Sequence, residues 1–213
     1  MKTIIFSDTH LGRKFELDKF NFLIGVIRKA DRVIINGDFW EGYVINFAEF
    51  AKTEWRRLFP ELKKRHTVYL PGNHERRSGV GREVKEFCDE LTDEFRLRSG
   101  RWKLVVSHGD KFDRLPELHL PIPIFHVVQE TEEWGIRAYG KSFLRLVYGV
   151  AAKAVKRTVM MQKQKDVTMV IGHTHIAEAD LTAGFINSGV IKGGLGQYLI
   201  MDGNRLELVE TSY

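Results

Sequence analysis

Short apolar runs that each end in a cluster of polar, metal-capable residues recur along most of the chain. The runs are rich in β-branched residues and predict strands, and stretches with helical periodicity follow the first two of them. Open α/β sheets gather their ligands beyond the carboxyl ends of the strands, so clusters that are remote in sequence are expected to converge. The clusters are Asp8-Thr9-His10, Gly37-Asp38, Gly72-Asn73-His74, Ser107-His108-Gly109-Asp110 and Gly172-His173-Thr174-His175.

Hydrophobic periodicity also predicts the order of elements around these clusters. The second predicted helix is expected to stop at Pro60. After His175 the helical pattern ends, and short runs with glycines between them predict antiparallel strands that complete a second sheet, with Asp202-Gly203-Asn204 as a hairpin turn. The predicted strands are 2–7, 32–36, 67–70, 102–106, 167–171, 185–186, 198–201 and 206–209, and the predicted helices are 15–30, 45–58 and 82–91.

Residues 115–165 interrupt this alternation, because they separate two strands by more chain than a crossover needs. We expect a mostly helical insertion or cap within a single domain of residues 1–213. Its second half, 141–158, is amphipathic, and residues 137–165 contain Lys and Arg but no Asp or Glu. Such a helix either packs its apolar face on the core or contacts anionic lipid. The apolar face comprises Phe143, Val147, Val150, Ala151, Ala154 and Val155, and the basic face comprises Lys141, Arg145, Lys153, Lys156 and Arg157.

The composition is that of a globular protein with an anionic partner. The chain has 213 residues, 43% of them hydrophobic, and 33 basic against 28 acidic side chains. Nucleic acid, phospholipid and phosphorylated metabolites all fit this balance. The first residues do not resemble a signal peptide, so we expect a cytoplasmic location, at the inner membrane surface if the basic helix binds lipid. Cys88 is the single cysteine, which excludes an internal disulfide, and we expect it to be packed in the core.

The polar clusters contain oxygen and imidazole donors without thiolates, a set that suits manganese, iron, zinc, cobalt or nickel. They are too numerous for one catalytic ion that keeps a position open for water, so two divalent ions are expected, with manganese favoured. In such sites a water activated between ions about 3.5–4 Å apart attacks phosphorus. The candidate ligands are Asp8, His10, Asp38, Asn73, His108, His173 and His175.

The same clusters, in the same order, resemble the signature of the calcineurin-like metallophosphoesterases, which is D-x-H, G-D, G-N-H, H-G and G-H-x-H. The resemblance extends from the first strand nearly to the last hairpin. It implies a four-layer α-β-β-α sandwich of two mixed sheets, with Asp38 as a bridge between two metal ions. The implied ligands of the first metal are Asp8, His10, Asp38 and His175, and those of the second are Asp38, Asn73, His108 and His173.

The resemblance also implies catalytic roles for His74 and for Asn73, which is a metal ligand as well. His74, beside the ligand Asn73, would protonate the leaving-group oxygen or steady the charge of the transition state. Asp110 either orients an imidazole or closes a turn. Three arginines near the metal-bearing loops are weak candidates for binding substrate phosphates, namely Arg76, Arg77 and Arg114.

Within the family, the segment 107–113 and the helical insertion resemble the UDP-2,3-diacylglucosamine hydrolases, which cleave a pyrophosphate in a lipid-linked nucleotide at the membrane surface. That branch carries arginine at the position of His74. The sequence therefore favours a relative that hydrolyses a phosphodiester or pyrophosphate, with a lipid-linked nucleotide or a small phosphorylated molecule as substrate.

Three alternatives use the same fold: a nuclease, a small-molecule phosphodiesterase or phosphatase, and a non-catalytic binding scaffold. A nuclease would need aromatic residues for base stacking in a basic groove, which Trp40, Trp55 and Trp134 do not obviously provide. Nucleic acid is therefore the less favoured partner.

Overall fold

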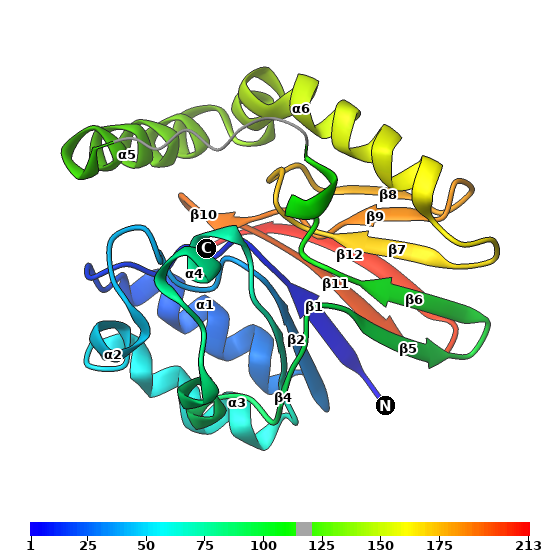
Figure 1. Cartoon of the computed structure of the whole chain (residues 1–213), viewed down its shortest axis with the longest axis horizontal. Coiled ribbons are helices and arrows are strands. Elements are labelled where there is room, and N and C mark those ends of the chain that lie inside the picture. Colours follow the sequence, from blue (N-terminus) through cyan, green and yellow to red (C-terminus); the bar gives the residue numbers. More distant parts are fainter. Residues whose placement is uncertain (114–120) are drawn as a thin grey trace.

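Two mixed β-sheets face each other at the centre of the molecule (Figure 1), in a computed structural model that describes residues 1–113 and 121–213. The first sheet contains β1 (Thr3–Phe6), β2 (Arg32–Asn36), β3 (Val68–Leu70), β4 (Glu90–Leu91), β10 (Ile191–Lys192), β11 (Leu195–Asp202) and β12 (Arg205–Ser212), in the order β10-β11-β1-β2-β3-β4 with β12 beside β11. The second sheet contains β5 (Phe95–Ser99), β6 (Trp102–Val106), β7 (Thr168–Ile171), β8 (Glu178–Asp180) and β9 (Phe185–Asn187), in the order β5-β6-β7-β9-β8.

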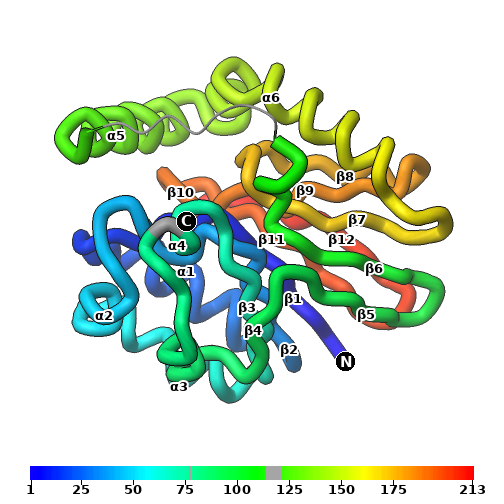
Figure 2. The backbone as a smooth tube through the Cα atoms, viewed as in Figure 1, coloured from blue at the N-terminus to red at the C-terminus, as the bar shows by residue number. Residues whose placement is uncertain are grey.

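Helices cover the outer face of each sheet and complete the four layers that the sequence predicts (Figures 1 and 2). The first sheet is covered by α1 (Leu17–Arg28), α2 (Phe47–Phe50), η1 (Glu54–Leu58), α3 (Phe59–Lys64) and η2 (Arg82–Glu86). The second sheet is covered by η3 (Asp110–Phe112) and α6 (Lys141–Gln162). The remaining helices are α4 (Asn73–Ser78) and α5 (Ile122–Tyr139).

Successive residues of β1 pack on opposite faces of the sheet, because side chains alternate across a strand. Ile4 packs among the helices on the outer face, whereas Ile5 lies between the sheets with Ile34 and Val170. A strand that is buried on both faces reads as a continuous apolar run, which is why the sequence signal for this strand is strong.

Parallel pairing brings the strand ends level with one another. Phe6 of β1 pairs with Ile35 of β2, and Asn36 of β2 pairs with Leu70 of β3. In the second sheet, β6 and β7 run parallel with Val106 opposite Val170. The polar clusters that follow these strands therefore lie along one edge of the sandwich.

The predicted helix over 45–58 is wrong in its continuity and in its end. The chain forms α2 and then η1, which begins where the Thr53 side chain accepts a hydrogen bond from the Trp55 amide. The helical path also continues through Pro60, which lies in the first turn of α3. Proline is tolerated there, because the first amides of a helix have no intrahelical acceptor.

Two further predictions are corrected by pairing between distant segments. The predicted helix 82–91 ends early, after η2, and its last two residues form β4, which lies parallel to β3 with Glu90 opposite Val68. The tail strands β11 and β12 join the first sheet and not the second, because β11 pairs with β1 through Ile4 and Ile200. The predicted hairpin turn is present, with Asp202 opposite Arg205.

The described part of the insertion, residues 121–165, is mostly helical, as predicted, but α6 turns a different face toward the core. Leu144, Val155 and Val159 are buried, whereas Val147 is 51% exposed and Val150 is 85% exposed. The helix rests on the sheet along a narrow stripe, while its apolar residues occupy a wider arc than this stripe can cover. None of the helices in the described ranges is apolar over enough length to cross a bilayer.

Replacement of Ile5 by alanine tests the packing between the sheets. We expect the free energy of unfolding to fall by about 2–5 kcal/mol, because the cavity would be closed in by both sheets. Leu181→Ala is the control, since Leu181 is 43% exposed, and it should cost less than about 0.5 kcal/mol. Urea denaturation of both variants measures the difference, and equal midpoints would contradict the assignment of Ile5 to the core.

Candidate metal centre

The residues at the strand ends adopt a left-handed backbone conformation that residues other than glycine rarely adopt. Left-handed conformations of this kind cost of order 1–3 kcal/mol each and cluster at functional sites. Backbone hydrogen bonds hold the first loop in place, from the Asp8 amide to the Gly37 carbonyl at 3.0 Å and from the His10 amide to the Asp38 carbonyl at 2.9 Å. The residues with positive φ at these strand ends are Asp8 (53°), His10 (45°), Asp38 (51°), His173 (66°) and His175 (56°).

Two buried carboxylates tie these loops together. Asp38, after β2, accepts a hydrogen bond from the His74 amide at 3.1 Å, and this links it to the loop after β3. Asp8, after β1, accepts from the His173 amide, with 3.1 Å to each carboxylate oxygen. Because β1 and β7 belong to different sheets, Asp8 connects the two halves of the sandwich.

The Nε2 atoms of His10 and His175 face each other. The Nδ1 of His10 donates to Glu41 at 3.2 Å, and the Nδ1 of His175 donates to Glu132 at 3.0 Å. In each neutral ring, Nε2 then carries a lone pair and no proton. The two Nε2 atoms are nevertheless 3.1 Å apart, and Asp8 Oδ1 lies 3.5 Å from the Nε2 atom of His175. Lone pairs at this distance repel unless a cation or an added proton lies between them.

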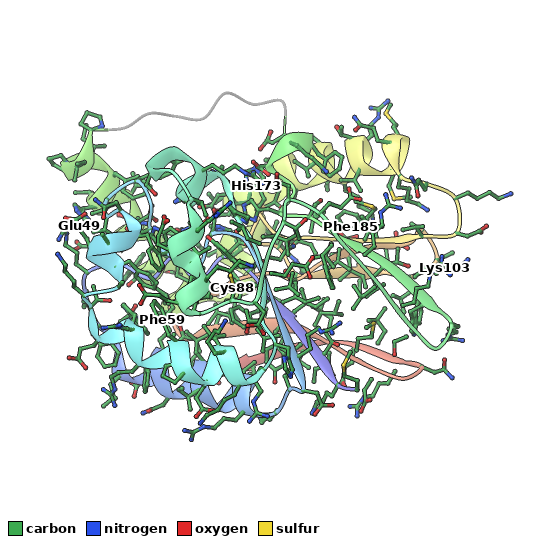
Figure 3. The ribbon with its side chains drawn as sticks, turned by 60° about the horizontal axis from the view of Figure 1, so that its bottom comes forward. Glu49, Phe59, Cys88, Lys103, His173 and Phe185 are labelled. Atoms are coloured by element: carbon green, nitrogen blue, oxygen red, sulfur yellow. The ribbon has the colours of Figure 1, made fainter. Side chains whose placement is uncertain are left out.

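A second group of acceptors converges around Asn73. Its Oδ1 lies 3.1 Å from His108 Nε2 and 3.1 Å from His173 Nδ1. His108 donates its Nδ1 proton to the Asn36 carbonyl at 2.8 Å, so in the neutral ring the lone pair is on Nε2, which lies 3.3 Å from Asp38 Oδ2. His173 follows β7 (Figure 3).

The pKa shifts of the buried histidines also indicate a site that attracts positive charge. Burial lowers the pKa of His175, but the carboxylates of Asp8 and Glu132 outweigh burial and raise this pKa to about 10. Asp38 likewise outweighs burial at His108 and raises its pKa to about 10. The cluster therefore demands positive charge, from protons or from metal ions. Buried carboxylate and imidazole donors without thiolates fit divalent cations such as manganese or zinc.

His74 lies beside the first group of acceptors. Its Nδ1 is 2.7 Å from Glu41 Oε1, its Nε2 is 3.8 Å from Asp38 Oδ2, and its ring meets that of His10 edge-on at 4.6 Å between centroids. Burial lowers the pKa of His74, but Asp38 and Glu41 outweigh burial, so this pKa is raised. Its half-buried side chain can hold a proton at the edge of the centre.

Carboxylates that support the site without having been predicted from the sequence include Glu41, Glu75 and Glu132. Glu41 follows Asp38 closely and binds the Nδ1 atoms of both His10 and His74. Glu75 is fully buried and accepts from the amides of Asp38, Phe39, Trp40 and Gly72. Both stand next to a metal-capable cluster, and this position was a usable signal. Glu132 lies within the insertion, where no local pattern marks it.

The insertion reaches the site through one face of α5. Phe125 lies 5.4 Å from the Tyr43 ring and 6.2 Å from the His74 ring, measured between centroids. One turn later Gln129 donates to Glu41, and Glu132 binds His175. A helix that the sequence treats as an appendage is therefore in contact with the candidate ligands.

The predicted phosphate-binding arginines are not placed as a group. Arg76 forms ion pairs with Asp93 and with Asp110. Asp110 thus holds Arg76 at the start of η3. Arg114 and the side chain of Arg77 lie outside the described residues, and their role stays a prediction.

Cys88 is buried and free, as predicted, in the core on the helical side of the first sheet (Figure 3). Burial raises the pKa of its thiol to about 11. A thiol with so high a pKa is a poor nucleophile at neutral pH, so the site does not depend on it.

Two cavities reach the candidate ligands, one beside α5 and the other beside the start of α6. One of about 230 Å³ is lined by His10, Arg13, Lys14, Glu41 and Gln129. The other, of about 270 Å³, is lined by Lys141, Leu144, Arg145, His175, Ile176 and Glu210. Each reaches one of the two opposed histidines, so a bound molecule at either place would touch the metal-capable cluster.

Comparison with known proteins gives one family and several structures of similar fold. Yfce, a phosphoesterase from E. coli, is 14% identical with a TM-score of 0.52, covering 100% of this chain and 99% of that chain. Wild-type Vps29 complexed with Zn²⁺ from Entamoeba histolytica is 11% identical with a TM-score of 0.51, covering 100% and 99%. Vacuolar protein sorting 29 from Cryptosporidium parvum is 13% identical with a TM-score of 0.50, covering 100% and 98%. These identities show likeness of fold alone.

No curated protein matches the sequence significantly. The sequence profile of the calcineurin-like phosphoesterase superfamily domain, however, matches residues 1–202. This match covers nearly the whole chain, including every strand-end cluster and the helical insertion. The protein belongs to the calcineurin-like phosphoesterase superfamily.

Proposed function

We propose that the protein is a metal-dependent hydrolase with two divalent ions that cleaves a phosphodiester or pyrophosphate bond. The observation that carries the proposal is the convergence of acceptor atoms, above all the Nε2 atoms of His10 and His175 at 3.1 Å. Membership of the phosphoesterase family supports the reaction class.

The two groups of acceptors divide the ligands between the ions. Asp8, His10, Asp38 and His175 would hold the first ion, and Asp38, Asn73, His108 and His173 would hold the second. When bound, the ions would activate water and neutralise charge at phosphorus. Manganese is the favoured metal, and iron, zinc, cobalt and nickel suit the same donors.

The protein's own side chains prepare this arrangement. The Asn73 amide donates its Nδ2 proton to the Tyr43 hydroxyl at 3.2 Å, which turns Oδ1 toward His108 and His173. Glu41 holds His74 through Nδ1 and leaves Nε2 toward Asp38. A proton on Nε2 of His74 would pass to the oxygen of the leaving group.

The alternatives are less well supported. Trp40 and Trp55 are fully buried and cannot stack on bases, which disfavours a nuclease. The fold is shared with Vps29, a protein named for vacuolar sorting, so a binding scaffold remains the competing proposal. His74, which can carry a proton beside the converging acceptors, favours hydrolysis over a scaffold.

A lipid-linked diphosphate is our finer proposal for the substrate, on the ground of the outward faces of α5 and α6. These helices lie along one side of the molecule (Figure 1). Trp134 of α5 is 63% exposed, and Leu146 and Val150 of α6 are 84% and 85% exposed. Lys153 and Arg157 continue the stripe of Leu146 and Val150 at helical spacing. Exposed apolar and basic residues on one helix face favour anionic lipid, whereas a second copy of this basic helix would be repelled.

A screen of manganese-loaded protein tests the reaction class. Monoesters, diesters, nucleotide sugars and lipid-linked pyrophosphates are compared, and we expect turnover of a diester or pyrophosphate that chelation of the metal abolishes and manganese restores. Absence of turnover together with absence of bound divalent metal would favour the scaffold.

Two substitutions separate metal binding from proton transfer. Asp38→Ala should lose bound metal and reduce turnover more than about a thousandfold, because several kcal/mol of metal catalysis disappear. His74→Ala should retain both ions while kcat falls by about a hundredfold to ten-thousandfold. Metal analysis and steady-state kinetics measure both, with His66→Ala as the control at an exposed histidine. Near-normal turnover of Asp38→Ala would refute the proposed centre.

Vesicle co-sedimentation tests the lipid proposal. We expect the protein to bind vesicles with anionic lipid at low salt, to bind neutral vesicles weakly, and to be released at high salt because screening weakens surface attraction. Leu146→Ser with Val150→Ser should reduce binding, and Leu181→Ser, at an exposed site outside α5 and α6, should not. Failure of the unsubstituted protein to bind anionic vesicles at low salt would eliminate the membrane contact.

A further inference from the structure

A buried carboxylate of the insertion joins four elements at the edge of the metal centre. Glu132 of α5 accepts from His175 Nδ1 at 3.0 Å and from the Tyr148 hydroxyl of α6 at 2.7 Å through one oxygen. Its other oxygen accepts from Lys192 of β10 at 2.5 Å. Glu132 is 8% exposed and Lys192 is 2% exposed, so the group is shielded from water.

We propose that Glu132 is a positioning residue that aims His175 Nε2 at a metal ion and thereby links the docking of α5 to metal binding. This inference rests on the proposed metal centre. The mechanism is geometric: a carboxylate accepts from Nδ1 and so leaves the imidazole with its free lone pair on Nε2. Without it, the ring would be free to turn or to carry its proton on Nε2.

The same helix supports the opposing histidine from behind. Gln129, three residues before Glu132, donates to Glu41 Oε2, the oxygen that accepts from His10 Nδ1. One face of α5 thus fixes both rings whose Nε2 atoms face each other. An ion held between them would be bound more weakly if this face were lifted away.

Coupling must act in both directions. If docked α5 increases metal affinity, the bound ion must stabilise docked α5 by the same free energy. Between Phe125 and Ile136 the inward face of α5 presents the polar side chains Gln129 and Glu132 to the site, so burial of apolar surface alone does not hold this part of the helix. Amides of α5 should therefore exchange with deuterium more slowly in metal-loaded protein than in metal-free protein.

A purely structural role makes a different prediction. Removal of the Glu132 charge leaves Lys192 buried without its carboxylate, which lowers stability whatever the metal does. Glu132→Gln combined with Lys192→Met removes both charges and restores the balance. If Glu132 acts on His175, metal affinity stays reduced in this double variant even where stability recovers.

The test is metal titration of the full-length protein with Mn²⁺ and Zn²⁺ by competition with a chromophoric chelator, beside thermal unfolding of the metal-free protein. Loss of a carboxylate behind a metal-binding imidazole typically costs about 10–100-fold in affinity, and we expect this loss for one of two ions in Glu132→Gln and in the double variant. Glu90→Gln, the same change at an exposed glutamate of β4, should leave both affinities unchanged.

The outcomes are distinguishable. Wild-type affinity for both ions in the double variant, with unsubstituted protein that binds two ions, would overturn the role of Glu132 and leave the proposed function intact. Unsubstituted protein that binds no divalent ion would overturn the metal centre itself. Deuterium exchange of α5 that is equal with and without metal would contradict the coupling even if the variants fold poorly.

Discussion

The structure depends on the compensation of buried negative charge where the two sheets meet. Asp8 and Asp38 are almost fully buried, and each binds the backbone amide of another strand-end loop. Those loops carry the histidines that face the carboxylates. A carboxylate in such surroundings is tolerated only with hydrogen bonds and nearby positive charge. The parallel strands end side by side, and the left-handed backbone at the candidate ligands turns their side chains inward. Both features bring the histidines next to the buried carboxylates.

Local signals account for what the sequence could predict. The strands that precede the clusters have apolar runs of the correct length, and the polar residues after them are contiguous in sequence, so their convergence followed from sheet topology. The errors lie where distant partners decide. Residues 90–91 form a strand because β3 is beside them. The orientation of α6 and the role of Glu132 likewise depend on partners far along the chain, such as Lys192, which is 60 positions from Glu132.

The insertion has two distinct faces, and this explains why its sequence pattern is difficult to interpret. On α5 the inner stripe carries Gln129 and Glu132, which meet the site, while Trp134 on the outer side is exposed. An amphipathic pattern normally predicts that the polar face of a helix is exposed to water. Here polar residues are buried because they hydrogen-bond to the histidines and to Glu41 at the candidate metal centre.

The order in which the chain is made gives the scattered site a further consequence. His10 and His175 are separated by 165 positions and yet approach within hydrogen-bond distance. During synthesis from the N-terminus, the loop that carries His10 therefore leaves the ribosome long before the loop that carries His175. A product truncated before residue 173 would carry Asp8 and His10 without His173 and His175, which contact them in the folded protein.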